Sequence, residues 1–116
     1  MTSEKTIECL FRTIDDKEWK NLNIIFHQDI IYERPGYQPL IGINCVKNFY
    51  ENERLVLLGQ HQIEQMIVVG NQGACWGQII GTKKDGSIID ELFADVYHFR
   101  DHLIIARRSY FFRPAI

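Results

Sequence analysis

The spacing of apolar residues changes along the chain, from a helical period near the N-terminus to a strand period in the second half. The first apolar stripe recurs at positions i, i+3, i+4 and i+7 and consists of Ile7, Leu10, Phe11 and Ile14. This spacing predicts an amphipathic helix within residues 1 to about 28.

Two more short helices are indicated downstream. Asp15 followed by Glu18 has the spacing of a capping box, which favours a short helix running through Trp19 and Leu22. A further stripe with helical spacing consists of Ile43, Val46, Phe49 and Tyr50. Between these helices, "DIIYERPGYQPLIG" predicts a short strand that ends at Pro35 and a turn-rich loop that reaches Gly42.

From residue 60 onward the chain has the pattern of successive strands. The strand segments are "HQIEQMIVV", "ACWGQIIGTK", "SIIDELFADVYHF" and "LIIARRSYFF". The connections "GNQG", "KDG" and "RDH" are short and polar, as hairpin turns are. Helices followed by an antiparallel meander predict an α+β fold, and a length of 116 residues fits a single domain over residues 1–116.

One strand segment, "IDELFADVYHF", carries an acid on an otherwise apolar face. With a period of two, that face consists of Ile89, Glu91, Phe93, Asp95, Tyr97 and Phe99. Two interpretations of Asp95 follow. Apolar neighbours can hold the carboxyl group neutral, so that it donates a hydrogen bond to a ligand oxygen. Alternatively, Asp95 pairs with Arg107 or His61 and stays ionised.

The predicted strands are apolar on both faces. Neighbouring apolar residues that point to opposite sides are Ile79 and Ile80, Ile104 and Ile105, and Phe111 and Phe112. A sheet that curves around a pocket on one face and meets a second copy of the chain on the other explains this pattern, so we expect a homodimer. Chance exposure of a few apolar residues is the alternative.

Composition removes several classes of function. Thirteen Lys and Arg against fifteen Asp and Glu give a net charge of −2 without a concentrated basic surface, so we expect no nucleic-acid partner. No segment has the length of a membrane helix or of a signal peptide, which favours a cytoplasmic protein without a membrane partner. Cys9, Cys45 and Cys75 are expected to be free thiols, and no residue pair has the spacing of metal ligands.

The chain resembles the nuclear-transport-factor-2-like superfamily, and within it the SnoaL-like polyketide-cyclase and ketosteroid-isomerase branches. The order of the helices, the "ERPGYQP" loop, the spacing from Gly42 to "FY" and the closing meander carry this resemblance. It implies a cone-shaped, curved, antiparallel-rich sheet wrapped around the N-terminal helices, as in a cystatin-like α+β barrel. It also implies a deep apolar pocket, a homodimer and no cofactor.

The resemblance implies roles for particular residues. "DVYHF" resembles the isomerase strand whose protonated acid donates a hydrogen bond, which gives that role to Asp95. "YERP" resembles the stretch that holds the general base; counting from Gly42 selects Glu33, and counting from Pro35 selects Arg34. The isomerase's tyrosine donor on the first helix has no match, because no Tyr precedes Tyr32.

A third branch of the superfamily, the epoxide hydrolases, fits less well. Its closing "RDYFD" motif resembles "RSYFF" at residues 108–112. In this chain Ser109 replaces an acid that the hydrolase reaction requires.

Other polar residues of the strands are candidates as well. His61 follows Gly59 and shares a face by parity with Ile63, Gln65 and Ile67, where it acts as a proton shuttle or lies at the pocket rim. Arg107 and Arg108 lie on opposite faces of the last strand. One of them should be solvated, and the other should pair with Glu91, Asp95 or Glu33 or hold the substrate.

Two functions remain. One is a cofactor-free acid–base enzyme of isomerase or cyclase type, acting on an apolar carbonyl or a polyketide- or steroid-like compound; the other is a non-catalytic binder of a small apolar molecule with a carbonyl or hydroxyl group. The catalytic candidates are Asp95, Glu33 and His61. The candidates for ligand binding are Arg34, Trp19, Tyr50, Trp76, Phe93, Tyr97, Arg107 and Phe111.

Overall fold

The predicted change from helical to strand period is found in the order of the elements. The computed structural model describes residues 1–113. Its helical segments are α1 (Ser3–Asp15), the 3₁₀-helix η1 (Trp19–Ile24), α2 (Ile43–Asn48) and the π-helix η2 (Phe49–Glu53). Its strands are β1 (Phe26–Glu33), β2 (Leu40–Ile41), β3 (Val56–Val69), β4 (Gln72–Lys83), β5 (Ile88–Arg100) and β6 (Leu103–Phe111).

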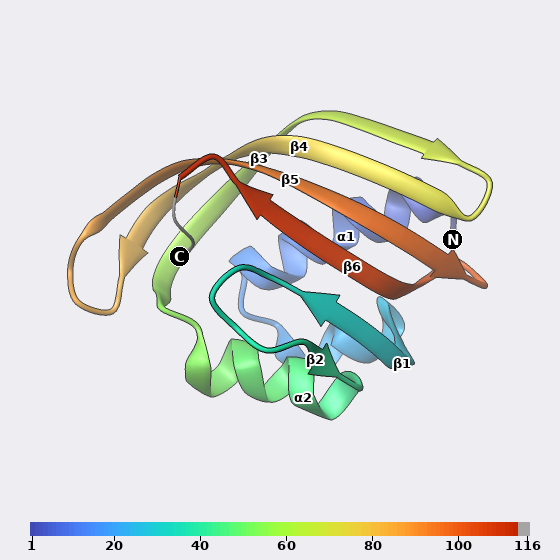
Figure 1. Ribbon diagram of the computed structural model, residues 1–116, viewed down its shortest axis with the longest axis horizontal. Helices are drawn as coiled ribbons and strands as arrows, with labels where there is room; N and C mark the ends of the chain where they lie inside the picture. The colour runs from blue at the N-terminus through green and yellow to red at the C-terminus, as the bar shows by residue number, and fades with distance from the viewer. Residues whose placement is uncertain (114–116) are drawn as a thin grey trace.

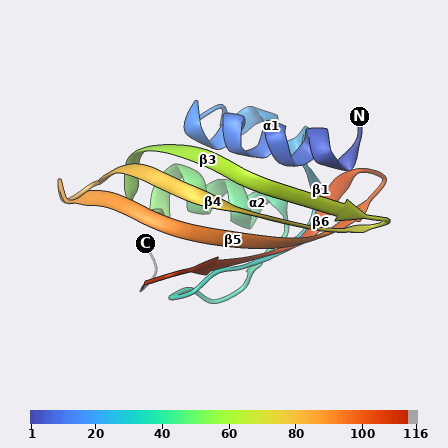
Figure 2. The same cartoon turned by 90° about the horizontal axis from the view of Figure 1, so that it is seen from above.

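The six strands form one curved sheet that does not close into a barrel (Figures 1 and 2). Their order is β2-β1-β6-β5-β4-β3, in which β1 runs parallel to β6 and all other neighbours are antiparallel. The turn between β5 and β6 has positive φ at both Asp101 and His102, as a two-residue type I′ turn requires. The predicted α+β fold and its hairpin meander are therefore confirmed.

The curvature of the sheet begins at two irregularities of β3. The register between β3 and β4 shifts between Val56 and Leu58 and again between Ile63 and Gln65. Gly81 and Gly77 lie opposite these bulges, and a Cβ at either position would come within 1.9 Å of a β3 carbonyl oxygen. Glycine thus permits the close approach of the two strands where β3 bends.

The first helix matches the prediction, whereas the second begins differently. Thr2 caps α1, because its hydroxyl accepts a hydrogen bond from the backbone N–H of Lys5 at 3.1 Å. The predicted capping box of Asp15 and Glu18 is wrong, since Asp15 ends α1 and Glu18 makes no side-chain capping bond to η1. Within residues 1–113, no helix is both long enough and apolar enough to cross a membrane.

The helices cover the concave face of the sheet, and the core lies between them (Figure 2). The apolar stripe of α1 is buried, and α1 lies against β3 and β6. Burial along β5 alternates from Ile89 to Phe99, so the predicted face of β5 is the inner one. Asp95 therefore lies inside the molecule among apolar side chains.

The convex face of the sheet is apolar and uncovered. Its exposed side chains include Trp76, Ile80, Leu92, Val96, Tyr110 and Phe112. Several of them border a groove of about 310 Å³ between β4, β5 and β6. Contiguous exposed apolar surface of this kind marks interaction sites in many proteins.

We expect a second copy of the chain to cover this convex face. Sedimentation at micromolar concentration should then give twice the chain mass of 13.7 kDa. Leu92→Lys places a charge in the middle of the face and should yield monomers, whereas Ile24→Lys, which alters an exposed apolar residue of η1, should leave the dimer intact. A wild-type protein that sediments as a monomer contradicts this prediction.

Candidate functional site

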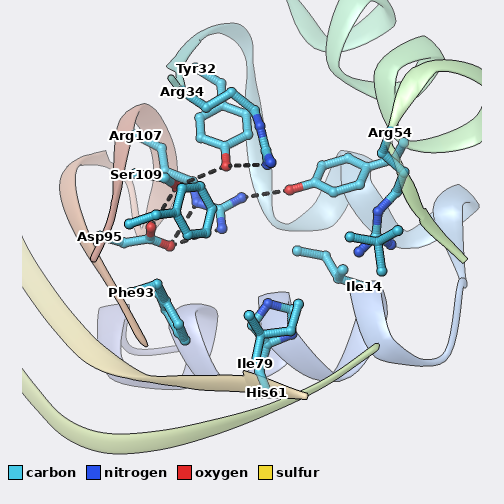
Figure 3. Close-up of a pocket in the computed structure, with 13 residues that line it drawn as sticks. Ile14, Tyr32, Arg34, Arg54, His61, Ile79, Phe93, Asp95, Arg107 and Ser109 are labelled. Carbon is cyan, nitrogen blue, oxygen red and sulfur yellow. Dashed lines mark hydrogen bonds and ion pairs between the residues drawn. The ribbon is translucent and has the colours of Figure 1, made fainter. Parts of the chain in front are cut away.

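A small cavity lies between the concave face and the helical layer (Figure 3). Its volume is about 30 Å³, whereas pockets for drug-sized ligands measure roughly 300–1,000 Å³. The lining residues are Ile14, Tyr32, Arg34, Tyr50, Arg54, Val56, His61, Ile79, Phe93, Asp95, Arg107, Ser109 and Phe111. The cavity can hold a group of a few atoms without rearrangement of these side chains.

An ion pair between Asp95 and Arg107 forms one wall of the cavity. The Arg107 Nη2 lies 2.8 Å from Asp95 Oδ2, and Nε donates to the same oxygen at 3.0 Å. Tyr97 donates to Oδ2 at 2.9 Å, and Ser109 donates to Oδ1 at 2.6 Å. Asp95 is 1% exposed and Arg107 is 5% exposed. Because Asp95 accepts each of these hydrogen bonds and donates none, the geometry favours the interpretation that it is ionised and paired with Arg107.

The pairing of strands places these side chains together. Asp95 on β5 lies opposite Ser109 on β6, and Arg107 on β6 lies opposite Tyr97 on β5 and Tyr32 on β1. Residues directly opposite each other on one face are close enough to interact. The register of β1, β5 and β6 thus builds the centre of the cavity wall.

Hydrogen bonds extend this centre to the rest of the lining. Arg107 Nη1 donates to the hydroxyl of Tyr50 at 2.8 Å. The hydroxyls of Tyr32 and Ser109 lie 2.8 Å apart, and Arg34 Nη1 donates to the Tyr32 hydroxyl at 3.1 Å. The Arg107 guanidinium also lies 4.4 Å from the centre of the Tyr32 ring. One connected network therefore joins β1, β5, β6 and η2.

This environment keeps two tyrosines neutral. Burial raises the pKa of Tyr50 to about 12, although the charge of Arg107 opposes the shift. Burial also raises the pKa of Tyr97 well above its usual range, and the Asp95 carboxylate adds to this effect. For Arg107, burial lowers the pKa, but the attraction of Asp95 and the neighbouring tyrosines outweighs it and raises the pKa. Both phenols are thus hydrogen-bond donors near neutral pH.

A second polar pair, His61 and Asp15, joins β3 to the end of α1. His61 Nδ1 lies 2.6 Å from Asp15 Oδ1, and the other Asp15 oxygen accepts the backbone N–H of His61 at 2.9 Å. The imidazole packs against the rings of Phe11 and Phe93, with centroids 4.8 and 5.4 Å away. Within residues 1–113, His61 Nε2 has no hydrogen-bond partner, so it is available to a ligand in the cavity.

The structure separates the two candidates for the general-base position. Arg34 lines the cavity, whereas Glu33 lies on the opposite side of β1. Glu33 is half-buried and pairs with Arg108, its neighbour in the β1–β6 register, at an N–O distance of 2.9 Å. The candidate base Glu33 therefore lies outside this cavity, because the alternation of a strand directs its side chain away from it. The predicted opposite orientation of Arg107 and Arg108 is confirmed.

The aromatic candidates divide among three places. Tyr50, Phe93 and Phe111 line the cavity. Trp19 stacks on Tyr50 with ring centroids 5.4 Å apart, but it does not line the cavity. Tyr97 is buried in the core, where its hydroxyl donates to Asp95. Trp76 lies outside this cavity, because the residue is 38% exposed on the convex face, where it borders the groove.

The strand period predicted the inward-facing residues of β3 only in part, and contacts between site residues that are distant in the sequence were not predicted. His61 and Ile63 point inward, but the bulge between Ile63 and Gln65 reverses the rest of the strand, so that Met66 faces the core and Ile67 is exposed. Asp15 and Arg54 were not identified as site residues, since no local pattern marks them as such. Within residues 1–113, no group of three His, Cys, Asp or Glu side chains could hold a metal ion.

The ion pair can be tested through stability. Asp95→Asn leaves the buried Arg107 charge unpaired, which should lower the free energy of unfolding by about 3–5 kcal/mol. The control Glu8→Gln alters an exposed acid of α1 and should change it by less than about 0.5 kcal/mol. Urea denaturation measures both. If Asp95→Asn is as stable as the control, Asp95 carries no paired charge and the neutral interpretation holds.

Alkaline pH should reduce the stability of the fold, because Tyr50 is buried as a neutral phenol. Its folded pKa of about 12 exceeds the ordinary value of 10.0, so the neutral phenol contributes stability that is fully present below pH 10 and is lost as the pH rises toward 12. The contribution is on the order of 2–3 kcal/mol. In urea denaturation at increasing pH, Tyr50→Phe should lose less stability over this range than the wild type. Tyr37→Phe, which alters a half-buried tyrosine outside the lining of this cavity, serves as the control, and equal slopes for Tyr50→Phe and the wild type contradict the assignment.

Solved structures share this fold at low sequence identity. A putative SnoaL-like polyketide cyclase from Jannaschia sp. CCS1 has a TM-score of 0.82 and 15% identity, covering 95% of this chain and 85% of its own. An NTF2-like protein of unknown function from Burkholderia pseudomallei has a TM-score of 0.85 and 13% identity, with 94% and 89% covered. An LEH-like epoxide hydrolase from M. tuberculosis has a TM-score of 0.81 and 13% identity, with 94% and 81% covered.

Sequence comparison gives the family. No curated protein sequence is similar enough to this chain to count as a match. The model of the SnoaL-like domain family matches residues 7–107, which includes all of α1 after its first turn, the three helical segments that follow it and the first five residues of β6. Together with the curved sheet and its NTF2-like structural neighbours, this match shows that the chain belongs to the SnoaL-like domain family.

Proposed function

We propose that this protein is a cofactor-free acid–base enzyme of isomerase or cyclase type that acts on a carbonyl compound. One observation carries the proposal: a histidine oriented by a carboxylate and a neutral tyrosine oriented by an arginine line the same cavity. A base and a hydrogen-bond donor that reach one ligand are what proton abstraction next to a carbonyl needs.

His61 provides the base. When Nδ1 donates its proton to Asp15, Nε2 carries the lone pair of the neutral imidazole. This nitrogen can take a proton from the carbon beside the carbonyl group, and Asp15 stabilises the imidazolium that forms. The rings of Phe11 and Phe93 restrict the orientation of the imidazole.

Tyr50 provides the donor. Its hydroxyl accepts a hydrogen bond from Arg107, and within residues 1–113 no acceptor is assigned to its own proton. A phenol that stays neutral can donate this proton to the carbonyl oxygen, and the bond strengthens as the enolate charge develops. The enolate then either regains the proton at another carbon, which is an isomerisation, or attacks a second carbonyl group, which closes a ring.

A non-catalytic binder is the second candidate function. The cavity volume of about 30 Å³ argues against a polyketide- or steroid-like ligand for either candidate, because such a compound needs far more space. The fold is compatible with both candidates, since one fold supports many unrelated functions. The two candidates differ in whether the protein moves a proton.

Isotope exchange tests the proposed reaction. In D₂O, nuclear magnetic resonance should show that the protein accelerates deuterium uptake beside the carbonyl group of small ketones, with 4-oxopentanoate and cyclohexanone as probes. His61→Gln should reduce this acceleration about 10²–10⁴-fold, since it removes the base. Asp15→Asn should reduce it as well, because the imidazole loses the carboxylate that orients it.

The matched control is His98→Gln, which alters a histidine on the convex face. This variant should retain the wild-type rate of exchange. If neither probe exchanges faster with the wild-type protein, or if His61→Gln is fully active, the acid–base enzyme is ruled out in favour of the binder.

A further inference from the structure

Arg54 is a buried cation of the cavity lining for which the proposed reaction has no use. It follows η2, where its backbone N–H donates to the carbonyl of Phe49 at 2.9 Å. Only 7% of the residue is exposed. Its guanidinium lies over the rings of Trp19 and Tyr50, at 5.9 and 5.4 Å from their centres. These rings hold the flat guanidinium in place without neutralising its charge.

The charge of Arg54 is not matched by a partner acid. Within residues 1–113, no carboxylate lies within ion-pair distance of it. The nearby acid Asp15 is paired with His61, and Asp95 is paired with Arg107. Burial lowers the pKa of Arg54, a direction that reflects the cost of holding this charge away from water.

Among the charged residues of the lining, Arg54 differs from Arg107 in its surroundings. Arg107 is paired with Asp95, which is the one carboxylate among the described lining residues, whereas no ion pair is formed by Arg54 within residues 1–113. Figure 3 shows Arg54 on the side of the cavity away from the Asp95 ion pair. A ligand that places a negative charge near Arg54 would supply the acid that this arginine lacks, and a charge-assisted hydrogen bond in a buried site is strong.

We infer that the ligand carries a carboxylate that binds Arg54, and that the substrate class is a small oxo acid. The inference deepens the proposed function, since the keto group of the acid takes the place assigned to the reacting carbonyl, between His61 and Tyr50. The assignment of a carboxylate to Arg54 depends only on Arg54 and its surroundings and is independent of the proposed reaction.

A carboxylate fits this site better than a larger anion does. The guanidinium presents its planar edge to a partner, and a planar carboxylate can accept two parallel hydrogen bonds from it. The cavity volume of about 30 Å³ favours a flat group of three heavy atoms over a tetrahedral phosphate. It also favours a short carbon chain between the carboxylate and the keto group.

A matched pair of probes tests the carboxylate. 4-Oxopentanoate and 4-oxopentanamide have nearly the same shape, and only the first is charged. Calorimetry in a buffer without carboxylate or phosphate should show that the wild-type protein binds 4-oxopentanoate about tenfold or more tightly than the amide. Inorganic phosphate should bind more weakly than 4-oxopentanoate.

Variants assign this preference to Arg54. Arg54→Met keeps the apolar stem and should abolish the preference, while Arg54→Lys keeps the charge and should retain part of it. Arg12→Gln removes an exposed arginine of α1 and should behave as the wild type. Circular dichroism identifies any variant that does not fold. If Arg54→Met does not fold, the test rests on the affinities of the wild-type protein and of Arg54→Lys for the two probes.

The outcomes for the anion site and for the reaction are distinguishable. Equal affinity for the two probes, no binding of 4-oxopentanoate at millimolar concentration, tighter binding of phosphate, or a preference that survives in folded Arg54→Met each overturns the carboxylate site. His61→Gln should lose isotope exchange and keep the preference. A wild-type protein that prefers the carboxylate but exchanges no proton supports the site and contradicts the proposed reaction.

Discussion

The buried ion pair of Asp95 and Arg107 is the interaction on which the rest of the site depends. Two charges held away from water are costly unless hydrogen bonds surround them, and here Tyr97 and Ser109 complete the shell of Asp95 while Tyr50 completes that of Arg107. These partners come from β5, β6 and η2. The ion pair therefore connects η2 to the sheet through Tyr50 and sets the chemistry of the cavity wall.

Much of the fold could be predicted from the sequence, because local patterns and short connections specify it. The alternation of β5 identified the buried face correctly from Ile89 to Phe99. The same rule failed in β3 after Ile63, where a bulge opposite Gly77 changes the parity. A bulge depends on the pairing of two strands, and nothing within "HQIEQMIVV" marks it.

The site could be predicted only in part, because its partners are distant in the sequence. Asp95, Arg107 and His61 were identified from the strands that carry them. Asp15 comes from a helix 46 residues before His61, and only the packing of α1 on β3 makes them neighbours. For Glu33 and Arg34, a shift of one residue decided which of them faced the cavity, and the sequence supported both alignments.

The character of the lining changes the expected ligand. The sequence suggested an apolar compound, because the inner face of β5 is rich in aromatic residues. Those rings are largely used in the core or beside the charged groups, and eight of the thirteen lining residues are polar or ionisable. A small cavity with this lining solvates charge better than it solvates hydrocarbon. A short, polar carbonyl compound therefore suits the cavity better than a steroid does, and its negative end belongs where Arg54 has no acid to pair with.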